Sequence, residues 1–220
     1  AIDDGERIAV FGDYDVDGVT ATALLYTYLD SAGADVYYKL PSRDDDGYGL
    51  SETAVDLMAA KGVSLIVTVD NGVSANAAIA HAKEQGVDVV VTDHHLPPQT
   101  LPEAAAIVNP QLPGDESPCK TLSGAGVAFK LAAALDGCTP DEMLPFYGDL
   151  AAIGTIADIM LLEGENRRIV KAGLALLQQT ERPGIAALIE ACGLGGKELT
   201  AENVSFGLAP RLNAAGRMDS

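Results

Sequence analysis

The stretch Arg7–Leu29, RIAVFGDYDVDGVTATALLYTYL, decides the fold. Its apolar run ends at Gly12, and Gly18 opens a segment with the apolar spacing of a helix. Three carboxylates stand between these glycines, at Asp13, Asp15 and Asp17. If the turn is extended, residues two apart point the same way, so the charges would crowd together at the carboxyl end of a strand and need a cation. The stretch predicts strand, acidic turn and helix, and the alternative is a solvated acidic loop.

The composition is that of a soluble globular protein. The chain has 220 residues, 48% of them hydrophobic, which is enough for one large domain or two small ones. No apolar run approaches the roughly 20 residues that span a bilayer, and no charged-then-apolar leader opens the chain. The cysteines form no C-x-x-C pair, which indicates reduced core residues of a cytoplasmic protein: Cys119, Cys138 and Cys192.

The charge balance excludes a generic nucleic-acid binder. With 14 basic and 32 acidic residues, the formal net charge is −18, whereas such binders owe their affinity to a broad basic surface. Any phosphate ligand must therefore be held locally, by metal ions at a carboxylate cluster or by a few converging arginines.

The first half of the chain alternates strands with helices. Strands are expected at 34–40, 64–69, 87–92 and 105–108, with helices at 52–60 and from a Ser74 cap through 84. This alternation predicts an α/β fold with a parallel five-stranded sheet. Acids follow three of the strands, so one edge of the sheet should carry Asp13, Asp15, Asp17, Asp70, Asp93, His94 and His95.

From Ser123 onward the pattern becomes helical. Helices are expected over 123–135, after a capping box formed by Thr139 and Glu142, and near 149–162, 166–179 and 184–191. We therefore expect a parallel α/β core over 1–122 and a helical portion over 123–220 that closes the metal cleft. The chain begins without methionine and ends after a basic stretch, which suggests a fragment of a longer protein.

Two clusters indicate metal chemistry. Asp93, His94 and His95 place a carboxylate and two imidazoles at a strand end, and mixed ligands of this kind suit manganese or magnesium in a two-metal hydrolase. Asp158 stands alone in an apolar helical run, where an ionised carboxylate needs a partner such as a metal. The alternatives are histidines that cap local backbone and a surface-facing Asp158.

Four motifs in order, GDYDVDG, VDNG, TDHH and GTIADIM, resemble the phosphoesterase motifs of the DHH family. SRDDDGYGL and PRLNAAGRM resemble its RecJ branch of single-strand-specific exonucleases. The resemblance spans essentially the whole chain.

The resemblance implies a site with two Mn²⁺ or Mg²⁺ ions. It implies Asp15 and Asp17 as ligands of separate ions, Asp70 as the bridge, His94 and Asp158 as further ligands of the second ion, and His95 as the residue that steadies the phosphate or leaving group. Phe11 stands where many DHH phosphoesterases have a metal-binding histidine. The first ion would then lose a ligand, which water or Asp13 would replace.

The resemblance also implies nucleic-acid contacts outside the metal motifs. Arg43 and Tyr48 lie in the loop after the second strand, where an exposed turn is the alternative. In the last segment the candidates are Arg211, Asn213 and Arg217, for which helix capping or a surface position is the alternative.

The implied function is metal-dependent hydrolysis of single-stranded DNA from the 5′ end, releasing mononucleotides, in DNA repair and recombination. A single-strand-binding protein and a helicase are the implied partners, and a second family domain (DHHA1-like) is expected beyond the end of this chain. One rival is a DHH phosphodiesterase for short oligonucleotides or cyclic dinucleotides, which would not need PRLNAAGRM. The other is a non-catalytic scaffold that binds single strands or a replication partner.

Overall fold

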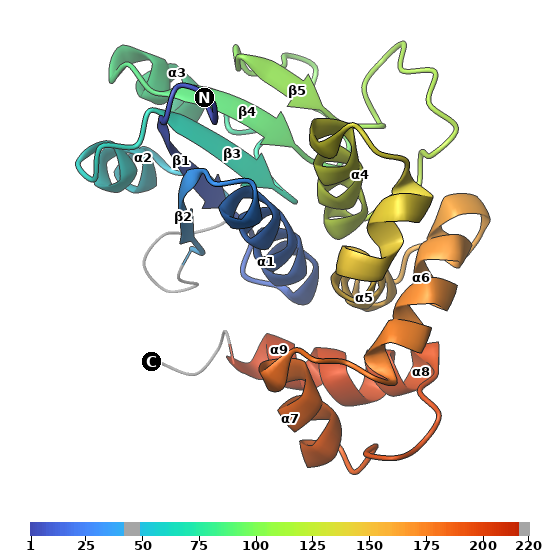
Figure 1. Ribbon diagram of the computed structural model, residues 1–220. Helices are drawn as coiled ribbons and strands as arrows, with labels where there is room; N and C mark the ends of the chain where they lie inside the picture. Colours follow the sequence, from blue (N-terminus) through green and yellow to red (C-terminus); the bar gives the residue numbers. More distant parts are fainter. Residues whose placement is uncertain (42–48, 216–220) are drawn as a thin grey trace.

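The computed structural model describes residues 1–41 and 49–215. A parallel sheet in the order β2-β1-β3-β4-β5 lies in the upper part of the molecule in Figure 1. The strands are β1 (Arg7–Phe11), β2 (Asp35–Lys39), β3 (Leu65–Val69), β4 (Asp88–Thr92) and β5 (Ala106–Val108). The predicted five-stranded α/β fold is confirmed.

Helices cover both faces of this sheet. One face packs against α2 (Glu52–Ala59) and α3 (Asn76–Glu84), and the other against α1 (Val16–Ser31), α4 (Gly124–Asp136) and α5 (Pro140–Ala157). Such two-sided cover explains why β1, β3 and β4 are nearly continuous apolar runs rather than alternating ones.

The remaining helices lie below the sheet in Figure 1. They are α6 (Gly164–Leu177), α7 (Pro183–Ala191), α8 (Ala201–Asn203), a π-helical turn (Val204–Leu208) and α9 (Ala209–Ala215). The apolar cluster that contains α1, α4 and α5 extends to this group through Val204 and Leu208. No helix in the described part of the chain is long and apolar enough to cross a membrane.

Three local predictions were wrong. Ser74 does not cap α3, which begins at Asn76 after Ala75 and has no side-chain cap. The two helical segments expected around residue 149 form one helix, α5, because the capping box at Thr139 starts a run that continues past Pro145. That helix ends at Ala157 rather than near 162. The helical turns of the last segment were not predicted at all, because glycine and proline interrupt its periodicity.

A candidate two-metal centre at the carboxyl edge of the sheet

The site lies where the strand order reverses. β2 and β3 flank β1 on opposite sides, so chain connections leave β1 and β3 in different directions. Ligands of open α/β sheets bind beyond the carboxyl ends of strands at such a switch point. Here the acidic turn follows β1, Asp70 follows β3, and the Asp-His-His run follows β4.

Asp70 is held in an unusual backbone conformation. Its φ is 62°, in the left-handed region that few non-glycine residues adopt. The loop after it is fixed from within, because Thr68 Oγ1 donates to the Asn71 carbonyl at 2.8 Å and Asn71 Nδ2 donates to the Val69 carbonyl at 2.9 Å. The strain is therefore supported by a network that aims the Asp70 side chain at the switch point.

Three groups of ligand atoms meet around Asp70. In each group the candidate atoms lie within 4.8 Å of one another. The groups are Asp13 with Asp15 and Asp70, Asp70 with His94 and His95, and Asp17 with His94 and Asp158. Asp70 belongs to two of the groups and His94 to two, so the groups share ligands as a two-ion site would.

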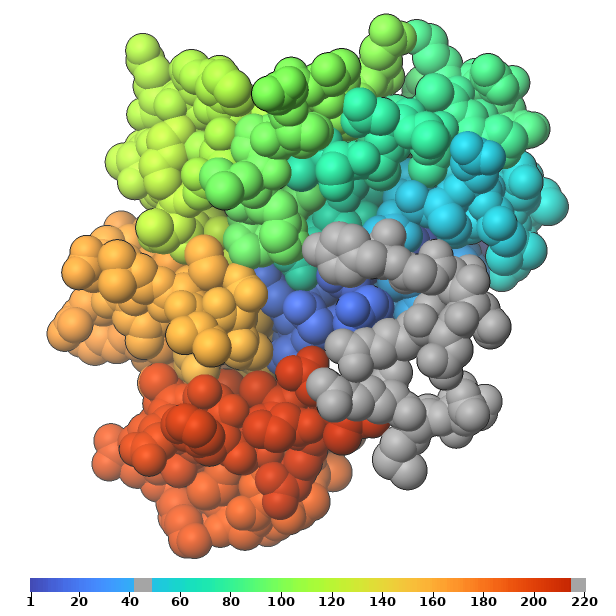
Figure 2. Space-filling view, turned by 180° about the vertical axis from the view of Figure 1, so that it is seen from behind, coloured from blue at the N-terminus to red at the C-terminus, as the bar shows by residue number. Residues whose placement is uncertain are grey.

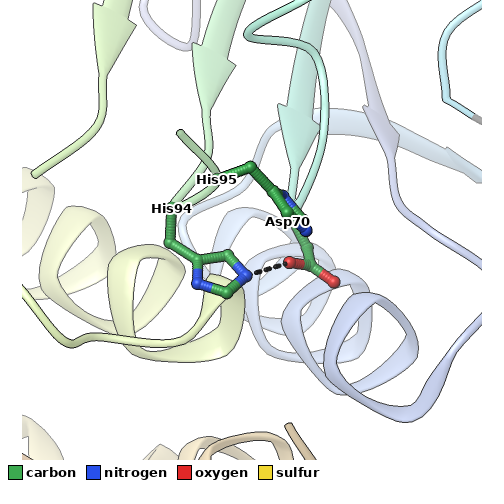
Figure 3. Close-up of side chains that lie close together, drawn as sticks. All are labelled: Asp70, His94 and His95. Atoms are coloured by element: carbon green, nitrogen blue, oxygen red, sulfur yellow. Dashed lines mark ion pairs between the residues drawn. The ribbon is translucent and has the colours of Figure 1, made fainter. Parts of the chain in front are cut away.

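His94 occupies the centre of the cluster. Its Nε2 lies 3.0 Å from Asp70 Oδ1, a contact drawn as a dashed line in Figure 3. The same nitrogen is 3.6 Å from Asp158 Oδ2 and 3.8 Å from Asp17 Oδ2. One imidazole nitrogen thus faces three carboxylates that come from separate parts of the chain.

Asp17 is locked by the start of α4. Its Oδ2 accepts from Gly124 N at 2.6 Å and its Oδ1 from Ala125 N at 2.9 Å, so it satisfies amides that a helix start leaves unpaired. Asp17 itself lies in the first turn of α1, whereas Asp15 caps that helix by accepting from Gly18 N at 2.9 Å. Asp17 was expected in the acidic turn before a helix that opens at Gly18, whereas the helix begins at Val16.

Two glycines make this close approach possible. A Cβ on Gly124 would lie 2.4 Å from Asp70 Oδ1, and a Cβ on Gly154 would lie 2.4 Å from Asp17 Oδ1. Any side chain at either position would displace a carboxylate of the cluster. Sequence reasoning missed both, and the only signal was their place beside apolar helical residues in SGAG and AIGT.

His95 is oriented by Asp93. Asp93 Oδ1 accepts from His95 Nδ1 at 2.7 Å and from the amides of His94 and His95, while its Oδ2 accepts from Val73 N at 3.0 Å. A carboxylate that holds one ring nitrogen fixes the direction of the other. The sequence pattern grouped Asp93 with His94 and His95 as mixed metal ligands, but in the structure Asp93 belongs to no ligand group and orients His95 instead.

Burial and repulsion shift the pKa values of the carboxylates. Burial raises the pKa of Asp17 to about 6 despite the opposing effect of His94. Burial also raises the pKa of Asp70 well above its usual range, and the charges of Asp17 and Asp15 raise it further. Burial likewise raises the pKa of Asp158. Ionising these side chains together is therefore costly unless a cation is present.

The Asp93–His95 pair behaves in the opposite way. Burial alone would raise the pKa of Asp93, but the hydrogen bonds from His95 and from the Val73 amide lower it. The hydrogen bond to Asp93 in turn raises the pKa of His95. Asp93 is thus an ionised support for the imidazole rather than a member of the repulsive cluster.

The donor set suits divalent cations. Asp70 Oδ1 is buried, and His94 Nε2 approaches it without the alignment of a hydrogen bond, so this oxygen has no hydrogen-bond donor among the described residues. A buried acceptor without a donor is costly unless something else satisfies it. Carboxylates with one or two imidazoles are ligands for manganese or magnesium.

The other predicted residues are distributed differently. Phe11 is fully buried in the apolar cluster beneath α2 and α3, so it does not face the carboxylates. Asn213 Oδ1 accepts from Val16 N at 3.2 Å, at the start of α1, and Arg211 Nη1 donates to the Gly207 carbonyl at 2.9 Å. The remaining nucleic-acid candidates, Arg43, Tyr48 and Arg217, lie outside the described residues.

The molecular surface is hollowed beside these elements. Figure 2 shows blue atoms of the first part of the chain at the bottom of a depression. The green segment around residues 90–100, the orange-yellow segment and the red final helices surround it. Segments that are far apart in the sequence therefore border one recess.

The profile of the DHH family's N-terminal domain matches residues 7–155 of this chain. The chain belongs to the DHH family. Two relatives named single-stranded-DNA-specific exonuclease RecJ, from Bacillus subtilis and Salmonella typhimurium, are 48% and 46% identical to it. Both alignments cover 100% of this DHH-family chain but only 27% and 40% of the relatives, so it spans less than half of their length.

Solved structures agree with the assignment to the DHH family. A crystal structure of exonuclease RecJ bound to manganese has a TM-score of 0.87 and 42% identity, and covers 99% of this chain and 55% of that one. RecJ in complex with Mn²⁺ from Thermus thermophilus has a TM-score of 0.82 and 39% identity, with 99% and 31% covered. The predicted resemblance to the RecJ branch is confirmed.

Proposed function

We propose that this chain carries the hydrolytic centre of a metal-dependent exonuclease that degrades single-stranded DNA from the 5′ end and releases mononucleotides. The observation that carries the proposal is the buried Asp70 Oδ1, which lacks a hydrogen-bond donor among the described residues and stands between two groups of ligand atoms. The relatives' names, which specify an exonuclease for single-stranded DNA, support the substrate class. DNA repair and recombination are the processes that this activity would serve.

The proposed ligands divide between two Mn²⁺ or Mg²⁺ ions. Asp15, together with Asp13, would hold the first ion, and Asp17, His94 and Asp158 the second, with Asp70 between them. Two such ions supply positive charge for the scissile phosphate and make the attacking water more acidic. The raised pKa values of Asp17, Asp70 and Asp158 support a cation at this cluster, because each marks a carboxylate that a cation would favour in its ionised form.

The chain's own contribution is preorganisation. The α4 amides hold both oxygens of Asp17 in place, and the Asp70 loop is fixed by Thr68 and Asn71. His95, whose side chain is 45% exposed, is the residue that would touch the phosphate or the leaving oxygen. Its raised pKa favours the protonated form, which can donate a hydrogen bond to an oxyanion.

Contacts to the DNA strand are proposed for the last helix. Arg211 is exposed and retains further donors beyond its bond to Gly207. Asn213 supports the start of α1, so its proposed role is to position the acidic turn as well as to contact the strand. The contacts of the DNA strand with Arg43, Tyr48 and Arg217 stay predictions. The same holds for a single-strand-binding protein and a helicase as partners, for the cytoplasmic location, and for the division of the chain between residues 122 and 123.

Strands labelled at the 5′ or the 3′ end test the proposal. In Mn²⁺ the chain should release labelled mononucleotide at once from the 5′-labelled strand, and Asp70→Asn should abolish this. Asp88→Asn is the matched control, because Asp88 is an exposed aspartate at the start of β4, away from the site. If hydrolysis were confined to short oligonucleotides or cyclic dinucleotides, the chain would be a phosphodiesterase for those substrates instead. If it bound strands without metal-dependent cleavage, it would be a non-catalytic scaffold.

A further inference from the structure

Five helices of the described chain end in the same way. In each, a residue one to three positions beyond the end of the helix adopts a left-handed conformation, its amide donates three residues back, and the next amide donates five residues back. For α4 these bonds are Gly137 N to the Ala134 carbonyl at 3.2 Å and Cys138 N to the Ala133 carbonyl at 3.0 Å. All five left-handed positions are glycine: Gly33, Gly62, Gly86, Gly137 and Gly193.

Helix α5 ends with the same bonds but without glycine. Ile159 N donates to the Ile156 carbonyl at 3.2 Å, and Met160 N donates to the Thr155 carbonyl at 3.2 Å. The φ of Ile159 is 57°, and for a β-branched residue this is a true outlier. Lack of space does not explain glycine elsewhere, because a Cβ at the five glycines would meet no atom within 4 Å.

Packing against the described residues does not compensate for this strain. Ile159 is 87% exposed, so its side chain gains almost nothing from burial. The backbone close to it is nevertheless anchored, since Asn166 Nδ2 donates to both the Thr121 and the Leu161 carbonyls. An apolar side chain that is exposed on a strained backbone position indicates a contact with something other than the described residues.

The position of Ile159 identifies the contact. It directly follows Asp158, whose carboxylate lies 3.6 Å from His94 in the metal cluster. Leu96, which directly follows His95, is likewise 82% exposed. The orange-yellow part of the chain that contains the end of α5 borders the hollow of Figure 2. A nucleotide whose phosphate lay at the cluster would bring its sugar and the apolar faces of its base close to this rim.

We infer that Ile159 is a positioning residue that packs against the base or deoxyribose next to the scissile phosphate. The inference rests on the proposed function, because the occupant is the DNA strand. The strained backbone at the end of α5 places a stiff, branched side chain directly beside Asp158. A nucleotide that rests on it would have its phosphate held in register with the metal ligands.

The test exploits opposite effects on stability and on substrate. Ile159→Gly should raise the melting temperature by about 2–4 °C because it relieves the strain. The same variant should raise KM for an oligothymidylate in Mn²⁺ about tenfold, with a smaller change in kcat, because a partly buried isoleucine contact is lost. Ile159→Val should retain the parent KM. Gly137→Val, at the equivalent end of α4, should lower the melting temperature without changing KM.

A cycle that combines Ile159→Gly with modified substrates tests which nucleotide Ile159 contacts. Strands with one abasic residue, moved along the first few positions from the cleaved end, are compared for the parent and for Ile159→Gly. At one position next to the scissile phosphate, removing the base should cost the parent about tenfold in KM and cost the variant little. If Ile159→Gly keeps the parent KM on every strand, the inference is wrong while the proposed function stands. If the parent itself neither binds nor cleaves the strands, both are refuted.

Discussion

Neutralising Asp70 should stabilise the metal-free protein. Burial lifts the pKa of Asp17 to about 6 from an ordinary 3.8, and a difference of about two units corresponds to about 3 kcal/mol for ionising that side chain in the folded chain. Asp70 is similarly buried, and its pKa is shifted in the same direction. In chelator at pH 7.5, Asp70→Asn, which removes this buried charge, should therefore have a higher free energy of unfolding and a higher melting temperature than the parent.

The pH dependence of stability tests independently whether Asp70→Asn is more stable than the parent because a charge is removed. A carboxylate whose folded pKa is raised favours the folded state at low pH, and this contribution is lost as the pH rises through the raised pKa of the folded state. Because the pKa of Asp70 is raised, the advantage of Asp70→Asn over the parent should be small near the ordinary pKa of 3.8 and should grow as the pH rises. In Mn²⁺ at pH 7.5 the parent should be more stable than Asp70→Asn. The ion stabilises the parent by binding to its folded state, whereas the variant lacks one of the ligands and binds the ion more weakly.

Thermal unfolding followed by circular dichroism, in chelator and in Mn²⁺ between pH 4 and 8, measures both effects. Asp88→Asn removes the same charge from an exposed position and controls for the net charge of −18. An Asp70→Asn variant that is no more stable than Asp88→Asn in chelator at pH 7.5 would refute the argument from charge repulsion.

Three further predictions follow from the same contacts. Phe11→His should destabilise the fold by about 3 kcal/mol, because it places an imidazole in an apolar cluster. Calorimetric titration with Mn²⁺ should show no tighter metal site in this variant, and a tighter site would mean that position 11 faces the metal. Gly154→Ala should lower kcat by displacing Asp17 and cost about 1–3 kcal/mol of stability, whereas unchanged kinetics would show that the cluster tolerates the shift. Arg211→Ala, with Asp70→Asn present to block cleavage, should flatten the slope of log affinity against log salt by about 0.7, and a parent-like slope would make Arg211 structural.

The sheet and most of the cluster were predictable because they depend on local patterns. Buried runs ending in Asp70 and Asp93 identify parallel strands and their shared edge without any knowledge of distant contacts. The two-ion division depended on the family resemblance, and the ligand groups are compatible with it. Asp13 was predicted only as a substitute ligand, yet the structure groups it with Asp15 and Asp70.

The remainder depended on contacts between distant segments. Nothing near Asp17 in the sequence indicates that it accepts from the first amides of a helix that starts at residue 124, and nothing near Gly154 indicates a carboxylate beside it. The end of α5 was misplaced because Ile159 continues the apolar pattern, while its backbone conformation is one that sequence rules assign to glycine. Phe11 was expected at the site by analogy, but alternation along β1 turns it to the opposite face.

The bond from Val16 N to Asn213 Oδ1 has a consequence for the order of folding. It joins residues 197 positions apart, and the bonds from Asp17 to the α4 amides join residues more than 100 apart. Closing such long loops is entropically costly and slows folding, so contacts of this kind form after the local elements. The start of α1, which presents two of the acids, is therefore completed only when the last described helix arrives. During synthesis, the growing chain would hold its acidic turn in an unfinished state until nearly all of these residues had emerged.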